Sequence, residues 1–401
     1  MNRRILLAAT ISLALLPISS AIAENAPGVT ATEIKIGATY PFSGPASAYG
    51  VVGHGLMAYV KALNDKGGIN GRQINFIALD DAYSPPKAVE QMRRLVENDE
   101  VAFVFAPLGT ATNAATIKYL NRMKIPDLFI VSGGSKFTNF TEYPYTTTGV
   151  PSYETEGKIY AKYIAEKLPN AKVALLYQND DLGKDFLNAL KGEFKNRFAD
   201  KVIALPYEFT DPTIDSQVVK LRNSGADIFL FGGTPKFAAQ AIRKIHETGW
   251  KPLLIVNVVA SAISSTLKPA GLDISTGVVS AAYLKDIADP KMKDDPGVKS
   301  YRELLGKYGS GADISDFNYI AGVVQGMLLE QVLKQCGDDL SRDNILKQSR
   351  SIKNLALPMV LPGILINTNG KNSQAFTQLK LQRFNGTGWE VFGEAIGAGA
   401  E

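Results

Sequence analysis

Cysteine is almost absent from this chain, which has a single one, Cys336, among 401 residues. One cysteine cannot form an intramolecular disulfide, so burial of a hydrophobic core must stabilise the fold. With 45% hydrophobic residues, the chain can bury a large core and form two or three domains. We expect two lobes.

Histidine is also scarce, with only His54 and His246, each within a predicted helix. Neither a histidine-dependent triad nor a two-histidine metal site has support. The chain lacks a phosphate-binding loop, a Gly-x-Ser-x-Gly elbow and a Cys-x-x-Cys pair. The glycine-rich segment 50–55 (GVVGHG) does not have the dinucleotide-binding spacing. We therefore predict no enzyme, no cofactor and no metal ion.

An excess of charge of one sign is missing as well. The chain has 43 Lys and Arg residues against 39 Asp and Glu residues, a formal net charge of +4. Two of the basic residues, Arg3 and Arg4, lie in the segment expected to be removed, which leaves +2. This balance argues against a nucleic-acid partner.

Long apolar runs are confined to residues 5–18, which follow Arg3 and Arg4 and precede Ala21-Ile22-Ala23. This order predicts an export signal at residues 1–23, cleaved after Ala23. No later run approaches the roughly 20 apolar residues that span a bilayer. Because no cysteine follows the cleavage site, we expect a soluble exported protein without a lipid anchor.

What the chain does contain is a regular alternation of apolar β-branched runs and segments of helical period, which predicts an α/β fold with parallel sheets. The predicted strands are 33–39, 73–79, 101–106, 127–131, 172–177, 202–207, 227–231, 253–257 and 277–282. The predicted helices between them are 48–65, 86–98, 111–123, 153–168, 182–198, 214–223 and 235–248.

The alternation restarts after the Thr-rich link 145–150, where we place the end of one lobe. Past residue 282 the chain turns mainly helical, at 296–307, 316–336 and 341–350, and closes with a β-like pair around 367–370. Because these late helices have no strands of their own, we expect them to complete the first lobe. The predicted lobes are 31–150 plus 281–376, and 151–280 plus 377–401.

Residues 34–106 read as one β-α-β unit whose first strand ends in the loop 40–45 (YPFSGP), followed by Tyr49-Gly50. In open α/β sheets, loops at the carboxyl ends of strands line ligand sites. We therefore expect this aromatic, serine-bearing loop to form one wall of a binding site.

Two further loops follow predicted strands at the same sheet edge. Residues 107–113 (PLGTATN) lead directly into a helix, where free N–H groups and the helix dipole favour an anion, although Thr110 or Thr112 would also serve as a simple helix cap. Residues 131–137 (VSGGSKF) offer backbone donors at Gly133 and Gly134 and hydroxyl groups at Ser132 and Ser135. We expect a carboxylate to lie between the two loops.

Together the segments 43–45 (SGP), 49–50 (YG), 66–71 (KGGING) and 80–81 (DD) resemble the N-terminal signature of periplasmic solute-binding proteins of the branched-chain amino acid type. The resemblance extends over nearly the whole mature chain. It implies two doubly wound Rossmann-like lobes joined by three crossovers, which is the type I periplasmic-binding-protein fold. It also implies a cleft that closes on one small molecule and delivery to an ABC-type permease.

The resemblance implies that the carboxylate-binding half of the family's site is retained. The family's serine after the third strand corresponds to Gly109, with Thr110 beside it. The second carboxylate loop matches at Gly134 and Ser135, and Tyr49 keeps the aromatic wall near the first helix.

The ammonium-binding half is altered in the same comparison. Val258 stands where amino acid binders place an acidic residue, and Leu182 and Thr234 replace two polar positions of the second lobe. Burying an ammonium group without a counter-charge costs several kcal/mol. Tyr83 and Leu108 also occupy positions at which relatives often have a disulfide, which brings two bulky side chains to the pocket rim.

The leading hypothesis is therefore a periplasmic binding protein for a small hydrophobic carboxylate without an α-amine, aromatic in character and similar to benzoate or cinnamate. Phe42, Tyr153 and Leu182 would add to its apolar surround, or would serve as core or hinge packing. The predicted ligand-binding residues are Phe42, Tyr49, Leu108, Gly109, Thr110, Gly133, Gly134, Ser135, Tyr153, Leu182, Thr234 and Val258.

The alternative is a binding protein for branched-chain or other neutral amino acids, with the acidic contact at Asp180, Asp181 or Glu154. A sensory module that presents its ligand to a membrane receptor would use the same fold. An exported α/β hydrolase is disfavoured by the missing nucleophile elbow. The expected partners are a small carboxylate and the permease subunits, and we expect a monomer.

Overall fold

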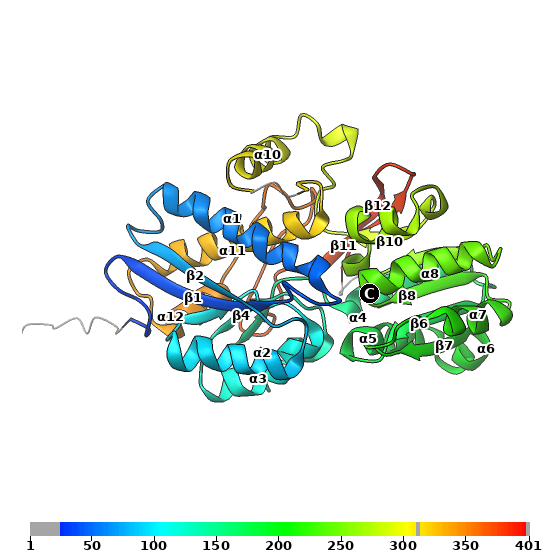
Figure 1. Ribbon diagram of the computed structural model, residues 1–401, viewed down its shortest axis with the longest axis horizontal. Helices are drawn as coiled ribbons and strands as arrows, with labels where there is room; N and C mark the ends of the chain where they lie inside the picture. The colour runs from blue at the N-terminus through cyan, green and yellow to red at the C-terminus, as the bar shows by residue number, and fades with distance from the viewer. Residues whose placement is uncertain (1–24, 310–312, 398–401) are drawn as a thin grey trace, which may run out of the picture.

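A computed structural model describes residues 25–309 and 313–397. The predicted export signal lies outside the described residues. Among those that are described, no helix combines the length and apolar character needed to cross a bilayer. The chain forms two α/β lobes side by side, one around each of two sheets (Figure 1).

The first lobe is built on a five-stranded parallel sheet of order β2-β1-β3-β4-β5. Its strands are β1 (Glu33–Tyr40), β2 (Gln73–Asp80), β3 (Phe103–Phe105), β4 (Asp127–Ile130) and β5 (Thr146–Thr148). Its helices are α1 (Gly50–Asp65), α2 (Pro85–Arg93), α3 (Thr110–Arg122), α10 (Pro296–Tyr308), α11 (Phe317–Cys336) and α12 (Arg342–Ser349). In Figure 1, α1 and α11 lie above the sheet, and α2 and α3 lie below it.

The second lobe is built on a seven-stranded sheet of order β12-β11-β10-β9-β8-β6-β7. Strands β6 (Val173–Gln178), β7 (Val202–Tyr207), β8 (Ile228–Gly232), β9 (Leu253–Val256) and β10 (Val279–Ala282) are parallel. The hairpin of β11 (Gln378–Phe384) and β12 (Trp389–Gly397) joins it antiparallel. The accompanying helices are α4 (Tyr153–Lys167), α5 (Asp181–Phe194), α6 (Phe198–Lys201), α7 (Asp215–Asn223), α8 (Pro235–Glu247) and α9 (Lys268–Ala270).

The buried strands read as continuous apolar runs because helices cover both faces of each parallel sheet. The side chains of β3 and β8, for example, are buried along their whole length. The predicted strands and helices therefore agree with the observed ones to within a few residues at their ends.

Close packing of two helices ties the late part of the chain to the first lobe. Gly55 of α1 lies against the Tyr319 carbonyl and Gly322 of α11 lies against the Val52 carbonyl, so a Cβ at either glycine would collide with backbone. The chain passes between the two sheets after β5, after β10 and before β11. The exact lobe boundaries stay a prediction.

The closing β pair differs from the one expected around residues 367–370. That segment forms a turn in which Asn369 Oδ1 accepts the N–H groups of Lys371 (2.8 Å) and Asn372 (2.9 Å). The hairpin lies further on, at β11 and β12, and turns at Asn385, whose Oδ1 accepts the Gly388 N–H (3.0 Å). Both turns carry Asn-Gly, but only the second is flanked by segments that alternate as strands do.

Asp127, the first residue of β4, carries a buried carboxyl group. It is fully buried, and neither side-chain oxygen accepts a hydrogen bond from the residues that the structure describes. Burial raises its pKa from 3.8 to about 8. Between these two pH values the folded state binds the proton that the unfolded state has released, so stability falls as the pH rises.

We expect Asp127→Asn to stabilise the protein by about 1 to 3 kcal/mol at pH 9, because the amide never has to ionise. At pH 4 the gain should nearly vanish. Urea unfolding at both pH values measures the difference. Asp200→Asn, at an exposed position, is the control, and an equal gain for Asp127→Asn at both pH values would contradict the assignment.

Candidate ligand-binding cleft

A cavity lies where the carboxyl ends of the two parallel sheets face each other. Its volume is about 40 Å³, which holds only a small group of atoms. A larger ligand would fit only if the lobes moved apart. The first lobe contributes residues that follow β1, β2, β3 and β4, and the second lobe contributes Leu182 and Val259. The lining residues are Tyr49, Val52, Tyr83, Leu108, Gly109, Thr110, Val131, Val150, Tyr153, Leu182, Val259, Tyr283, Phe317, Asn318 and Ala321.

Half of the predicted site residues line this cavity, namely Tyr49, Leu108, Gly109, Thr110, Tyr153 and Leu182. The others, which are Phe42, Gly133, Gly134, Ser135, Thr234 and Val258, do not line it. Whether any of the twelve contacts a ligand stays a prediction.

The start of α3 retains the features of an anion site. Gly109 has φ +121°, and a Cβ there would collide with the Thr112 hydroxyl and approach the Tyr83 ring to 2.9 Å. No side chain caps the helix, because Thr112 Oγ1 donates to the Leu108 carbonyl (3.0 Å) and Thr110 Oγ1 pairs with Ser132 Oγ (2.8 Å). The expected alternative, a simple threonine cap, is therefore not what these hydroxyl groups do.

The second expected carboxylate loop binds a carboxylate that belongs to the protein. The Ser135 N–H and hydroxyl both donate to Asp185 on α5 of the second lobe, at 2.7 and 2.6 Å. Beside them Lys136 Nζ lies 3.2 Å from Asp181 Oδ2. Burial raises the pKa of Asp185 to about 6, although the two Ser135 donors act to lower it. Ser135 thus joins the two lobes.

Two aromatic side chains also bridge the lobes. The Tyr49 hydroxyl donates to the Val259 carbonyl (3.1 Å), and the Tyr83 ring packs against Phe209 with centroids 4.8 Å apart. Each bridge has one partner in either lobe and lies at the cavity. These two contacts join the lobes beside the cavity.

Two of the predicted residues that do not line the cavity, Phe42 and Thr234, contact other parts of the protein. The Phe42 ring packs on His54 (5.0 Å) and Tyr40 (5.5 Å), on the side of α1. The Thr234 N–H donates to the Tyr207 hydroxyl (3.2 Å).

Val258, the position expected to be acidic in an amino acid binder, is buried, and its N–H donates to Glu156 Oε1 (2.7 Å). Glu156 lies on α4 and also accepts from the Tyr160 hydroxyl (2.8 Å). Burial raises the pKa of Glu156 to about 7. Sequence reasoning missed Glu156, although helical spacing places it on the same face of α4 as the buried residues Tyr153 and Tyr160.

An acidic group nevertheless lies beside the cavity. Asp180 caps α5, where Oδ1 accepts the N–H groups of Leu182 (3.0 Å) and Gly183 (3.3 Å) and Oδ2 accepts from Gln178 Nε2 (2.6 Å). Burial raises its pKa, and these donors lower it.

Asp180 is not among the lining residues, but it accepts the N–H of Leu182, which is one of them. After the dominant effect of burial, its charge is among the causes that raise the pKa of Tyr49 and of Tyr83. It has the same effect on Tyr153. All three line the cavity, so Asp180 lies within electrostatic reach of it.

The late helix α11 supplies residues that sequence reasoning did not find. Phe317, Asn318 and Ala321 line the cavity from its first turns, together with Tyr283 just after β10. No motif marks them, since they reach the cavity only through the crossovers between the lobes. Among the described residues, no group of three potential metal ligands was found.

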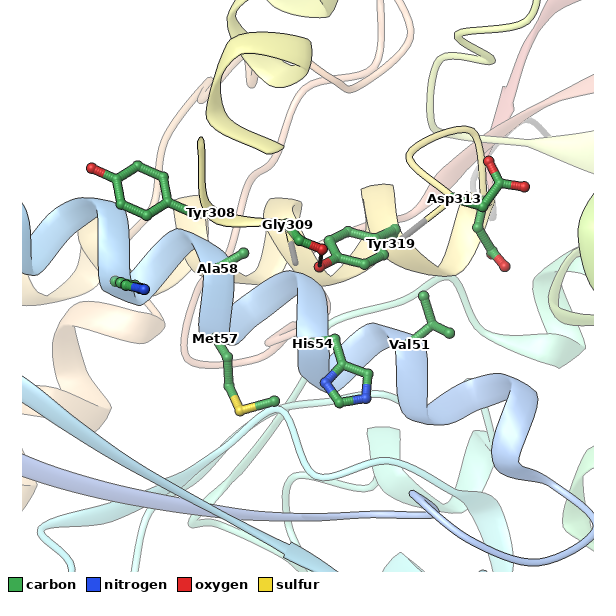
Figure 2. A pocket seen from close by; sticks show the side chains of 10 residues that line it. Val51, His54, Met57, Ala58, Tyr308, Gly309, Asp313 and Tyr319 are labelled. Carbon is green, nitrogen blue, oxygen red and sulfur yellow. Dashed lines mark hydrogen bonds between the residues drawn. The ribbon is translucent and has the colours of Figure 1, made fainter. Parts of the chain in front are cut away.

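A second hollow, of about 460 Å³, lies on the outer side of α1 and shares no residue with the cleft cavity. Figure 2 shows Val51, His54 and Met57 on α1, with Tyr308 and Tyr319 across the hollow. Burial lowers the pKa of His54. The hollow adjoins residues 310–312, which lie outside the described part of the chain, and we assign no site to it.

The chain is similar in sequence to a family of known proteins. Residues 33–387 match the model of a family described as periplasmic binding protein. The chain is 25% identical over 339 residues to the Leu/Ile/Val-binding protein homolog 7 of Brucella suis, covering 81% of this chain and 82% of that protein.

Solved structures share the fold at low identity. A branched-chain amino acid ABC transporter protein from Thermus thermophilus, with bound valine, has a TM-score of 0.81 at 15% identity, covering 92% of this chain and 97% of that one. A solute-binding protein from R. palustris in complex with benzoate has a TM-score of 0.75 at 18% identity, covering 92% and 98%. The chain therefore belongs to the periplasmic binding protein family.

Proposed function

We propose that this protein binds a neutral α-amino acid in the cleft between its lobes and delivers it to an ABC importer. The observation that carries the proposal is the pairing of an uncapped helix start with a half-buried carboxylate. The start of α3 at Gly109 and Thr110 would take the ligand carboxylate, and Asp180 would take the ammonium group.

Asp180 would supply the negative charge whose absence at Val258 argued against an amino acid ligand. An ammonium group in a closed cleft needs a counter-charge, and Val258 has none. Asp180 caps α5 of the second lobe beside the cavity residue Leu182, whereas α3 belongs to the first lobe. A ligand held between them would contact both lobes and stabilise the closed form. The Leu/Ile/Val-binding relative and the valine-bound structure agree with this reading.

A second candidate is the hydrophobic, benzoate-like carboxylate that the sequence favoured. It is supported by the aromatic lining from Tyr49, Tyr83, Tyr153, Tyr283 and Phe317. The benzoate-bound structure has the same fold. The Asp180 carboxylate argues against it, since a second anion in the cavity would be repelled.

Family membership implies a periplasmic location. Cleavage after Ala23, the monomeric state and the permease partner stay predictions.

Replacing Asp180 with asparagine separates the two ligand classes. Asparagine is as good a helix cap as aspartate, so α5 should keep its start. We expect leucine affinity in titration calorimetry to fall at least tenfold, because the ammonium loses its counter-charge, and 4-hydroxybenzoate affinity to stay equal or rise. Glu193→Gln, exposed on the same helix, is the matched control. Tight 4-hydroxybenzoate binding by the wild type without leucine binding would overturn the proposal.

Replacing Ser135 with alanine tests how the lobes are held together. The change removes the hydroxyl donor to Asp185, and a hydrogen bond to a charged group contributes roughly 1.5 to 3 kcal/mol. Since ligand binds the closed form, we expect affinity to fall about tenfold or more.

A double-mutant cycle with Asp185→Asn locates the partner of Ser135. If Ser135 acts through Asp185, the second substitution adds little to the first, and the costs are not additive. Fully additive losses in calorimetry would show instead that Ser135 acts on the ligand.

A further inference from the structure

The first turn of α11 brings an amide group into the cleft cavity. Asn318 is the second residue of this helix and lines the cavity between Phe317 and Ala321. Its side chain is buried, with 3% of the residue exposed. Its amide is polar, whereas the residues beside it on the cavity wall, Phe317 and Ala321, are apolar.

The local structure of the helix start does not use this amide. The cap residue Asp316 accepts the Asn318 backbone N–H through Oδ1 (2.7 Å) and the Ser264 hydroxyl through Oδ2 (2.7 Å). Burial raises the pKa of Asp316, and a weak interaction with the Asn318 amide is the last of the causes that lower it, so the carboxylate is a nearby acceptor in the fold but lies outside hydrogen-bond geometry. Even so, Nδ2 is buried and makes no hydrogen bond within the described part of the chain.

A buried donor without an acceptor destabilises a fold, and an apolar residue of similar size would fill the same space without that cost. The neighbouring residues of the wall are apolar in this way. Ala321 lies one turn further along α11, and the Phe317 ring packs edge-on against Tyr283 with centroids 6.0 Å apart. Folding alone therefore gives no reason for an amide at this position. A ligand atom that accepts a hydrogen bond would give one.

We propose that Asn318 is a specificity-determining residue that recognises a hydrogen-bond acceptor on the side chain of the bound ligand. The inference rests on the proposed function, in which the α3 start and Asp180 take the two charged ends of an amino acid. The α11 wall is then left for the side chain. The preferred ligands are neutral amino acids with a hydroxyl or amide group, rather than purely apolar ones. An anionic side chain is excluded, because Asp316 lies near.

Ligand pairs of equal shape provide the test. Leucine and asparagine have nearly the same outline, as do valine and threonine, so each pair differs mainly in hydrogen-bonding capacity. We expect wild-type protein in titration calorimetry to bind the polar member of a pair about three- to tenfold more tightly. Asn318→Leu should remove or reverse this preference while apolar affinity is kept or improved.

Two further variants are controls for Asn318→Leu. Asn318→Ala, which only truncates the side chain, should lose the preference as well and covers the case in which leucine disturbs the packing. Gln335→Leu changes an amide to an apolar group on the same helix, 17 residues further on, which is about 25 Å along its axis. It should leave the preference of the wild type unchanged.

The outcomes separate this inference from the proposed function. An equal affinity ratio in wild type and Asn318→Leu, or a wild-type preference for the apolar members, overturns the inference even though amino acids bind. If no amino acid binds, the proposed function fails. Asn318 is then tested by the ratio of the affinities for 4-hydroxybenzoate and benzoate, compared between the wild type and Asn318→Leu. Binding of neither kind of pair overturns both.

Discussion

Parallel strands place all their carboxyl ends at one edge of a sheet, and the whole molecule follows from two such edges facing each other. Helices must cover both faces of a parallel sheet, so the edge is the place where loops are free to carry function. Here the loops after β1, β3 and β4 meet the loops after β6 and β9 around one cavity. Three crossings of the chain between the sheets keep the two edges opposed, and one hydrophobic cluster continues from the first sheet at Ile36 and Phe103 to the second at Leu175 and Val279.

Carboxylates at this interface decide how the lobes interact. Asp185 receives both Ser135 donors, and Asp180 caps α5 beside the cavity residue Leu182. Glu156 is buried behind Val258 with two donors. Each of these three acids accepts hydrogen bonds that offset the cost of burying its charge, whereas Asp127 accepts none from the described residues. A loop expected to contact the ligand can therefore hold the lobes together instead, as Ser135 does.

Much of the architecture could be predicted because local patterns express it directly. Apolar runs such as 101–105 identified buried strands, and amphipathic stretches identified the helices between them, including the late ones. The hairpin at β11 and β12 was misplaced because the Asn-Gly pair at residue 369 was read as its turn, although only the Asn-Gly pair at residue 385 is flanked by segments that alternate as strands do. The cavity residues Gly109 and Thr110 were found because they lie between a strand and a helix, whereas Leu182 came from the resemblance to the family and Tyr49 from both the aromatic loop and that resemblance.

By itself the sequence determined the class of the molecule: an α/β protein without disulfide, triad or metal motif, whose strand-end loops carry hydroxyl, glycine and aromatic residues. Only the tertiary structure decided which of those loops meet the cavity. Ser135 turned to Asp185, Glu156 reached Val258 from another helix, and Asn318 entered the cavity from α11. The physical reason is that these partners are 50, 102 and more residues apart in the chain. Local periodicity sets the secondary structure, whereas the approach of distant charges and donors depends on how the two lobes close.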